Sequence, residues 1–263
     1  MARGLGTRMR KSHSTVTLDN TQSAIADLGL KAMIPTGRPF LDYVLSGVAD
    51  AGFNQVCLVI GPEHDVVRNY YMEEIRPQRL SIQFAIQERP LGTADAVAAA
   101  ADFADDEFFL VMNSDNYYPV ESLQGLRGLS ECGLAGFSCE GLLRDGQMTM
   151  ERIGKYALLS VDDEGYLSAV IEKPETTEIT KRGSRALVSM NLWIFSPNIF
   201  SACTAIEPSV RGEFEIADAV TYAMKYLGEK FRVLSFDAPV LDLTHRADIE
   251  PITKRLARLE VRL

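Results

Sequence analysis

A glycine-rich loop followed by cations lies near the start of the chain, "GLGTRMRK" from Gly4 to Lys11. Glycines at this spacing let the backbone turn tightly and point its N–H groups at an anion. Thr7, Arg8 and Arg10 add a hydroxyl and two guanidinium groups that suit phosphate oxygens. The loop lacks the third glycine of a dinucleotide fingerprint, and no Gly-Lys-Ser/Thr follows as in a Walker loop. The loop therefore indicates another kind of phosphate cradle, with a plain turn as the alternative.

Two aspartates further along the chain are candidate metal ligands. Asp115 ends the apolar segment "EFFLVMNSD", and Asp242 lies within "VLDL". Carboxylate oxygens are hard ligands that suit Mg²⁺. The alternative for Asp115 is a turn residue at a strand end, and the alternative for Asp242 is a solvent-facing position on a strand. Two lysines, Lys31 and Lys173, add positive charge, and the alternative for Lys173 is a surface position on a hairpin arm.

Strands and helices alternate through the first half of the chain. Apolar or alternating runs predict strands at 55–61, 79–87 and 107–115. Apolar residues at helical spacing predict helices at 40–52 and 93–104. The alternation predicts an α/β protein with a Rossmann-like, mostly parallel sheet that is flanked by helices.

Ligands of such sheets bind beyond the C-terminal ends of the strands. We therefore expect Gly4–Thr7, Gln87 and Asp115 along one edge of one crevice. A polar strand end is the alternative for Gln87. Thr93 begins its helical stretch as a plausible N-cap.

The second half of the chain is richer in strand signals. A hairpin at 155–174, a strand at 188–195 and helices at 215–228 and 249–263 follow one another. The apolar stripe of the last helix indicates packing on its own sheet more than a dimer seam, although a homo-oligomer stays open. No internal repeat or low-complexity linker interrupts the chain, which predicts a single domain over 1–263.

Composition narrows the class of protein. Hydrophobic residues make up 46% of the 263 residues and charged residues 24%, which is typical of a soluble globular protein. A net charge of −9 argues against a nucleic-acid surface, so an anionic substrate would need local cations. The absence of a long apolar run or an apolar leader predicts no membrane partner and a cytoplasmic location. Four scattered cysteines and three histidines share no metal-ligand spacing.

Seven stretches, taken together, resemble the sugar-1-phosphate nucleotidyltransferases, similar to glucose-1-phosphate thymidylyltransferase. "GLGTRMR" resembles the signature loop, "KAMIPTGRPFLDYVL" the K-P-M-L-P-x-x-x-K-P-L-I stretch, and "QERPLGTADAV" the Q-x-x-P-L-G-T-A-x-A-V segment. "VMNSDNYY" stands in the place of G-D-N, and "VIEKPE" matches E-K-P. "RGEFEIADAV" is similar to R-G-E-x-E-I-T-D, and "VLDLTHRADI" to W-x-D-T-G-T-P-E-D-L. The matches follow the family's order from Ala2 to about Ile249.

The resemblance implies one displacement reaction that depends on Mg²⁺. A phosphate oxygen of a sugar 1-phosphate attacks the α-phosphorus of a nucleoside triphosphate, and pyrophosphate leaves without a covalent intermediate. Neutralising and aligning two polyanions is the main requirement of such a step. The resemblance also implies a nucleotide-binding half at 1–120 and a half at 121–263 that carries the β-rich sugar-phosphate site and the C-terminal helix.

The family's motifs imply a role for each matching residue. The implied nucleotide ligands are Gly4, Leu5, Gly6, Thr7, Arg8, Gln87, Gly92 and Thr93, and the implied metal ligands are Asp115 and Asp242. Gln87 would read the base edge, and Gly92 would let the base or sugar approach the backbone. The implied sugar-phosphate ligands are Tyr156, Ala157, Glu172, Lys173 and Asn191, and the implied catalytic residues are Arg8, Lys31, Asp115 and Lys173.

Several positions depart from the family pattern. Ser114 replaces a glycine before Asp115, and Ala157 replaces a glycine where bare backbone would meet the sugar. The segment 11–30 is longer than usual and suggests a lid or an interface. Most of the family's first strand is missing before Gly4, which suggests a misplaced start or a shortened central strand. A version extended upstream is then expected to be more stable.

The family resemblance leaves the nucleotide open. Thymidylyl or uridylyl transfer is favoured by the context of Gln87. Guanylyl transfer onto mannose 1-phosphate or a cyclitol phosphate is the next alternative, and a non-catalytic regulatory subunit is another. A Rossmann dehydrogenase is a distant alternative, because the third glycine is missing.

Overall fold

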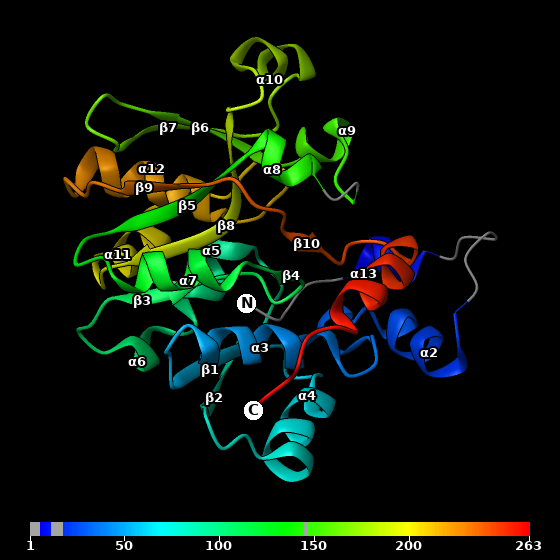
Figure 1. Cartoon of the computed structure of the whole chain (residues 1–263). Helices are drawn as coiled ribbons and strands as arrows, with labels where there is room; N and C mark the ends of the chain where they lie inside the picture. The colour runs from blue at the N-terminus through cyan, green and yellow to red at the C-terminus, as the bar shows by residue number, and fades with distance from the viewer. Residues whose placement is uncertain (1–5, 12–17, 145–146) are drawn as a thin grey trace. The chain divides into compact units, whose positions relative to one another are not determined.

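The computed structural model describes residues 6–11, 18–144 and 147–263 (Figure 1). The chain forms two compact units that interleave along the sequence. Unit 1 comprises Met1–Pro90, Asn113–Val120 and Leu241–Leu263, and unit 2 comprises Leu91–Met112 and Glu121–Val240. Gly4, Leu5 and the three residues before the loop fall outside the described residues.

Two parallel strands and a buried helix form the centre of unit 1. Strand β1 (Gln55–Ile60) pairs with β2 (Ser81–Ile86) in parallel, with Ile60 opposite Ile86. Helix α3 (Phe40–Asp50) is buried along ten of its eleven residues, as expected for a helix that is apolar on most of its faces. Both predicted strands and the predicted helix are therefore confirmed.

A second pair of strands in unit 1 joins distant parts of the sequence. Strand β4 (Asn116–Tyr117) and strand β10 (Leu241–Asp242) are antiparallel, with Asp242 opposite Asn116. Each strand has only two residues, so neither produces a periodic pattern that sequence reading could detect.

Short helices complete unit 1. They are α1 (Thr7–Arg10), α2 (Asn20–Leu28), the 3₁₀ helix η1 (Lys31–Met33), α4 (Asp65–Asn69), the π-helix η2 (Tyr70–Ile75), the 3₁₀ helix η3 (Arg246–Asp248) and α13 (Ile249–Leu256). Ile249, Ile252 and Leu256 of α13 are buried, as the prediction of packing within the chain required. The predicted range 249–263 was too long, because α13 ends at Leu256 and Leu259 is 41% exposed. Asp19 caps α2 in a capping box with Gln22.

A six-stranded mixed sheet forms the core of unit 2. Its strands are β3 (Phe109–Val111), β5 (Gly133–Ser138), β6 (Ala157–Val161), β7 (Leu167–Ile171), β8 (Leu187–Phe195) and β9 (Arg232–Phe236), in the order β7-β6-β8-β5-β9 with β3 also on β8. Only β5 and β9 pair in parallel among these strands; the pairs on β8 and the β6–β7 hairpin are antiparallel. Trp193, Phe195 and Phe231 pack together in its core, with ring centroids 5.7–6.2 Å apart.

Eight helices are described around this sheet. They are α5 (Thr93–Ala98), α6 (Ala101–Ala104), α7 (Val120–Arg127), α8 (Cys139–Leu143), α9 (Met150–Ile153), α10 (Thr176–Arg182), α11 (Asn198–Ala205) and α12 (Ile216–Tyr226). Helix α5 packs against α11 and α12 (Figure 1).

The α/β class is confirmed, and the pairing is more antiparallel than the alternating pattern suggested. The pairs β1–β2 and β5–β9 are parallel, but the third predicted strand shrinks to β3 and pairs antiparallel with β8. A short turn accounts for the antiparallel β6–β7 hairpin, whereas the antiparallel partners of β8, namely β3, β5 and β6, lie far from it in sequence and could not be predicted from local patterns. No helix among the described residues is long and apolar enough to cross a bilayer.

Candidate active site

The pairing of β4 with β10 brings the two predicted metal ligands onto adjacent strands of unit 1. Asp115 directly precedes β4, and its carbonyl oxygen accepts a hydrogen bond from the N–H of Leu243 at 2.9 Å. Asp242 ends β10 and is 3% exposed. We call Asp115 and Asp242 the acidic pair.

Lys31 lies beside the acidic pair. Its Nζ is 2.8 Å from Oδ2 of Asp115, and both side chains are partly exposed. Burial alone would lower the pKa of Lys31, but Asp115 and, more weakly, Asp242 favour its charged form and raise that pKa overall. Arg8 opposes them, so it is also within electrostatic reach of Lys31. Four of the predicted residues are thus gathered in unit 1.

The glycine loop turns at Gly6, where the described part of the loop begins. Gly6 has φ of 57°, a left-handed conformation, and a Cβ atom there would lie less than 3.0 Å from the backbone of Gly29. Thr7 and Arg8 follow in α1 and are exposed. Tight packing against Gly29, two residues before Lys31, therefore fixes the point at which the loop turns.

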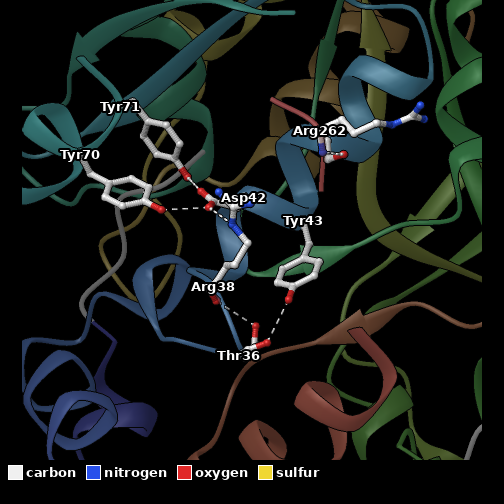
Figure 2. A network of polar contacts seen from close by, with 8 residues as sticks. Thr36, Arg38, Asp42, Tyr43, Tyr70, Tyr71 and Arg262 are labelled. Atoms are coloured by element: carbon white, nitrogen blue, oxygen red, sulfur yellow. Dashed lines mark hydrogen bonds and ion pairs between the residues drawn. The ribbon is translucent and has the colours of Figure 1, made fainter. Parts of the chain in front are cut away.

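A buried polar network anchors the segment that follows Lys31 (Figure 2). Thr36 N–H donates to the carbonyl of Arg38 at 2.7 Å, and the Tyr43 hydroxyl donates to the carbonyl of Thr36 at 3.1 Å. Nε of Arg38 donates to Oδ2 of Asp42 at 3.2 Å. The loop between η1 and α3 is therefore tied to the first turn of α3.

Asp42 is the centre of this network. Its carboxylate is fully buried and accepts hydrogen bonds from the hydroxyl groups of Tyr70 and Tyr71, each at 2.9 Å. Burial raises the pKa of Asp42, and the hydrogen bonds from Tyr71 and Tyr70 and the charge of Arg38 partly offset the shift. The sequence did not single out these residues, because Asp42 reads as an ordinary first-turn helix residue.

The segment after β10 binds Asp242, the buried member of the acidic pair. The Thr244 hydroxyl lies 2.8 and 3.0 Å from the two carboxylate oxygens of Asp242. Asp248 accepts hydrogen bonds from the N–H groups of Thr244 and His245 at 3.0 and 2.7 Å. Thr244 replaces a glycine of the family stretch, and the hydroxyl it adds orients Asp242.

Asn116, which follows Asp115 and lies opposite Asp242 in the β4–β10 pair, was not predicted. It is 1% exposed, and its Nδ2 has no hydrogen-bond partner among the described residues. A buried donor without a partner is uncommon and often marks a binding or catalytic site. In the sequence, Asn116 stands out only as the residue that follows Asp115 in the "VMNSDNYY" motif.

The acidic pair fits Mg²⁺ by the chemistry of its oxygen donors. Mg²⁺ is usually held by one or two carboxylates together with substrate phosphates and water. No group of three or more His, Cys, Asp or Glu side chains that could hold a metal occurs in the described part of the chain. Two carboxylates on paired strands therefore match a substrate-bridged magnesium better than a closed protein cage.

Gln87 follows β2, the second of the two parallel strands of unit 1. It is 3% exposed, and its N–H donates to the carbonyl of Ile60 at 2.8 Å. The position is a strand end, as the sequence predicted, and the side chain is buried rather than solvent-facing.

In unit 2, Glu172 and Lys173 follow β7, next to charges from another part of the sequence. The Glu172 side chain is accessible to solvent. Its pKa is raised mainly by partial burial and, to a lesser degree, by the charge of Asp218. The charges of Lys173 and Arg211 lower this pKa and partly offset the shift. Lys173 has φ of 46°, which is strained for a residue with a side chain. Arg211 forms an ion pair with Glu215. The E-K-P and R-G-E-x-E-I stretches therefore meet in unit 2.

The other predicted sugar-side residues lie on or next to neighbouring strands of unit 2. Ala157 begins β6, is 6% exposed and lies opposite Ser189 of β8. Tyr156 precedes it, and Asn191 follows two residues after Ser189 with φ of 57°. Two strained non-glycine residues, Lys173 and Asn191, therefore occur among the five predicted sugar-phosphate ligands.

Gly92 and Thr93 contact the protein's own backbone in unit 2. Gly92 has φ of 112°, and a Cβ there would lie 2.5 Å from the carbonyl oxygen of Phe214. The Thr93 hydroxyl accepts a hydrogen bond from the N–H of Ile216 at 2.8 Å. The predicted N-cap is wrong, because Gly92 occupies that position and Thr93 binds the start of α12 instead. Close approach of Phe214 thus gives Gly92 a structural requirement of its own.

Comparison with known proteins places these features in a family. The Nucleotidyl transferase family profile matches residues 27–235. The UTP–glucose-1-phosphate uridylyltransferase AglF of Haloferax volcanii is 26% identical over 97% of this chain and 94% of its own length. The glucose-1-phosphate thymidylyltransferase of Streptomyces griseus is 27% identical over 84% of the chain.

Some relatives are much longer than this chain. It spans 52% of the low-salt glycan biosynthesis nucleotidyltransferase Agl11 of Haloferax volcanii, at 27% identity, and 55% of the Streptomyces griseus enzyme. Among solved structures, a UDP-glucose pyrophosphorylase complexed with UDP-glucose matches with a TM-score of 0.73 and 17% identity, covering 98% of this chain and 96% of that chain. That match concerns the fold. The chain therefore belongs to the nucleotidyl transferase family, and the resemblance to sugar-1-phosphate nucleotidyltransferases that its motifs indicated is confirmed.

Proposed function

We propose that this protein transfers a nucleoside monophosphate from a nucleoside triphosphate to a sugar 1-phosphate. A phosphate oxygen of the sugar 1-phosphate forms a bond to the α-phosphorus, the bond to the β-phosphate oxygen breaks, and pyrophosphate leaves. The observation that carries the proposal is the meeting of Lys31, Asp115 and Asp242 through the β4–β10 pair. A lysine beside two carboxylates suits phosphoryl transfer, which needs charge neutralisation and alignment more than proton transfer.

In unit 1, different residues bind different parts of the nucleoside triphosphate. The backbone of the glycine loop and Arg8 hold the β- and γ-phosphates, and Lys31 binds the α-phosphate. Gln87 reads the base edge from the end of β2. Asp115 and Asp242 would hold Mg²⁺, which when bound neutralises phosphate oxygens and draws charge from the α-phosphorus. Thr244 and Asp248 keep Asp242 in place.

In unit 2, the proposed sugar-phosphate ligands are the predicted ones. Glu172 accepts hydrogen bonds from sugar hydroxyls, Lys173 pairs with the phosphate, and Asn191, Tyr156 and Ala157 line the sugar. The strained backbone of Lys173 and Asn191 supports this assignment, because such strain concentrates at binding sites. Gly92 and Thr93 support the nucleotide side by fixing the loop that follows Gln87.

We propose thymidylyl or uridylyl transfer as the specific reaction. The uridylyltransferase and thymidylyltransferase among the relatives support this choice, as does the "QERPLGTADAV" segment. Ala157 carries a methyl group where the family has glycine and crowds the sugar site, so we propose a sugar other than glucose.

The test measures pyrophosphate release with Mg²⁺ from dTTP, UTP, GTP, CTP and ATP, each with a panel of sugar 1-phosphates. Mass spectrometry of the products identifies the nucleotide sugar. We expect dTTP or UTP to react with one sugar, and Asp115→Asn to lower the rate by about 10²-fold or more, because an electrostatic stabiliser is lost. Asp50→Asn is the matched control, since Asp50 pairs with Arg79 and Arg262 outside the site.

Triphosphate binding without any nucleotide sugar, for every pair, would contradict transfer and favour the regulatory subunit. Reaction of GTP alone would overturn the choice of base but not the reaction. Equal rates for Asp115→Asn and the unaltered protein would remove Asp115 from the metal site.

A further inference from the structure

Arg246 is a buried arginine in the segment that follows the acidic pair. Its side chain is 8% exposed. Nε donates to the carbonyl of Met9 at 2.9 Å and Nη2 to the carbonyl of Arg10 at 3.4 Å. Nη2 also binds Oδ1 of Asp27 in α2 at 2.5 Å. One guanidinium therefore joins α1, α2 and the chain after β10.

Helix α1 needs an external partner to keep its shape. It has only four residues, and a single turn of helix is unstable by itself because nucleation is costly. The last carbonyl groups of any helix lack partners within it, and those of Met9 and Arg10 are in this position. Arg246 supplies donors and positive charge at the helix C-terminus, where both are favourable. Because α1 carries Thr7 and Arg8, Arg246 fixes the proposed triphosphate loop.

The same arginine is linked to the acidic pair by a rigid turn. Thr244 binds Asp242, and Asp248 binds the N–H groups of Thr244 and His245, so the backbone from Asp242 to Asp248 is held at both ends. Arg246 projects from the middle of this turn. The Arg246 side chain therefore links α1 directly to the turn that follows Asp242, in addition to the packing of Gly6 on Gly29 and the hydrogen bond from Arg10 to the carbonyl of Leu28.

This arrangement is a property of this chain's own sequence. The family stretch that "VLDLTHRADI" resembles has proline at the position of Arg246. Proline has no side-chain donor and cannot bind the carbonyl groups of α1. Lysine could reach one carbonyl but lacks the planar fork that serves two at once.

We propose that Arg246 is a positioning residue that holds the triphosphate loop at a fixed distance from the acidic pair. The inference rests on the proposed function for the identity of the ligand. Its consequence is specific: loss of Arg246 weakens productive binding of the triphosphate and leaves binding of the sugar 1-phosphate unchanged. A displacement of about 1 Å in such a group can cost about 10²-fold in rate.

The experiment compares Arg246→Ala and Arg246→Lys with the unaltered protein in full steady-state kinetics. We expect Arg246→Ala to lower kcat/KM for dTTP or UTP by about 10²-fold, with KM for the sugar 1-phosphate unchanged, and Arg246→Lys to lie between. Millimolar guanidinium ion should partly restore Arg246→Ala but not Arg246→Lys. Arg79→Ala is the matched control: it removes another ion-paired arginine of unit 1 and should leave both KM values unchanged.

Calorimetric titration with Mg²⁺–dTTP and Mg²⁺–UTP separates this proposal from the proposed function. If no sugar is transferred but Arg246→Ala still weakens triphosphate binding tenfold or more and guanidinium restores it, the positioning role stands and the reaction fails. Equal triphosphate affinity in Arg246→Ala and the unaltered protein would overturn the positioning role, whatever the activity. Equal loss for both substrates in the folded Arg246→Lys variant would also overturn it, because that result indicates general destabilisation.

Discussion

Glu172 offers a test at the scale of single residues. Its pKa is raised above the ordinary 4.5, by partial burial and by Asp218. The ionised carboxylate accepts hydrogen bonds from sugar hydroxyls more strongly than the protonated acid does. As the pH falls through the raised pKa, KM for the sugar 1-phosphate should therefore rise. Asp218→Asn removes a neighbouring negative charge, lowers the pKa of Glu172 and should move this rise to lower pH.

Comparison of pH profiles for kcat/KM measures the effect directly. The titration of the substrate phosphate is common to both proteins and cancels in the comparison. Asp102→Asn, at an exposed site in α6, is the control and should leave the profile in place. An unshifted profile in Asp218→Asn would show that Asp218 does not act on Glu172.

Residue types predicted part of the site. Motif spacing found Lys31, Asp115 and Asp242, which the structure brings together. Motif spacing did not predict that Asn116 is a buried donor or that Arg246 binds the carbonyl groups of α1. Both properties depend on contacts with distant parts of the chain. A buried arginine cannot be told from a surface one by type alone.

The junction of α3 with the π-helix η2 offers a test at the scale of elements. Asp42→Ala should lower the free energy of unfolding by about 2 kcal/mol or more, because the buried Tyr71 hydroxyl and the Arg38 guanidinium lose their acceptor. In a double-mutant cycle with Tyr71→Phe we expect a coupling energy of about 1 kcal/mol. Urea unfolding followed by circular dichroism measures all four proteins.

Tyr226→Phe is the control for this cycle, since Tyr226 is 61% exposed. Additive effects of the two changes would mean that the Asp42–Tyr71 hydrogen bond contributes little to stability. The destabilisation by Asp42→Ala should also grow in acid. The pKa of Asp42 is raised on folding, so its charged form is disfavoured in the folded protein and the cost of keeping it grows as the pH rises.

Elements with strong periodicity were predictable, and short ones were not. β1, β2, β8, α3 and α12 match their predicted ranges within a few residues. The predicted helix at 93–104 breaks into α5 and α6 between Ala98 and Ala101, within an alanine run that local propensity alone would keep helical. β4 and β10 exist through pairing with each other, which a local pattern does not reveal.

Thiol labelling offers a test at the scale of the whole molecule. Cys132, Cys139 and Cys203 are buried in unit 2, whereas Cys57 is half-buried in unit 1. Burial raises the pKa of Cys132 to about 11 and that of Cys203 to about 12, so few thiolates form near neutral pH. Iodoacetamide at pH 8 should modify Cys57 first, and rising urea should expose the other three together. Peptide mass spectrometry reads each site.

Ser138→Ala serves as a positive control within unit 2, because it removes the N-cap of α8 and a hydrogen bond to Asp237. It should shift labelling of the three cysteines to lower urea and leave Cys57 unchanged. Independent labelling of Cys132, Cys139 and Cys203 at different urea concentrations would contradict cooperative unfolding of unit 2.

For the whole molecule, the sequence predicted the α/β class but not how the chain is divided between the two units. The expected halves met once, near residue 120, whereas Leu91–Met112 belongs to unit 2 and Leu241–Leu263 returns to unit 1. A chain that leaves a unit and returns to it is defined by contacts between distant segments. Composition and periodicity describe only neighbours in sequence.

The return of the chain at β10 has a consequence during protein synthesis. β1, β2 and Lys31 leave the ribosome early, whereas Asp242 and Arg246 lie more than a hundred residues after Asp115. Until the segment from Leu241 has been translated and has emerged, β4 has no partner strand and α1 has no arginine at its C-terminal carbonyl groups. Nascent chains can therefore finish the sheet of unit 2 while the acidic pair is still incomplete. Translation itself delays assembly of the acidic pair until the segment from Leu241 has been made.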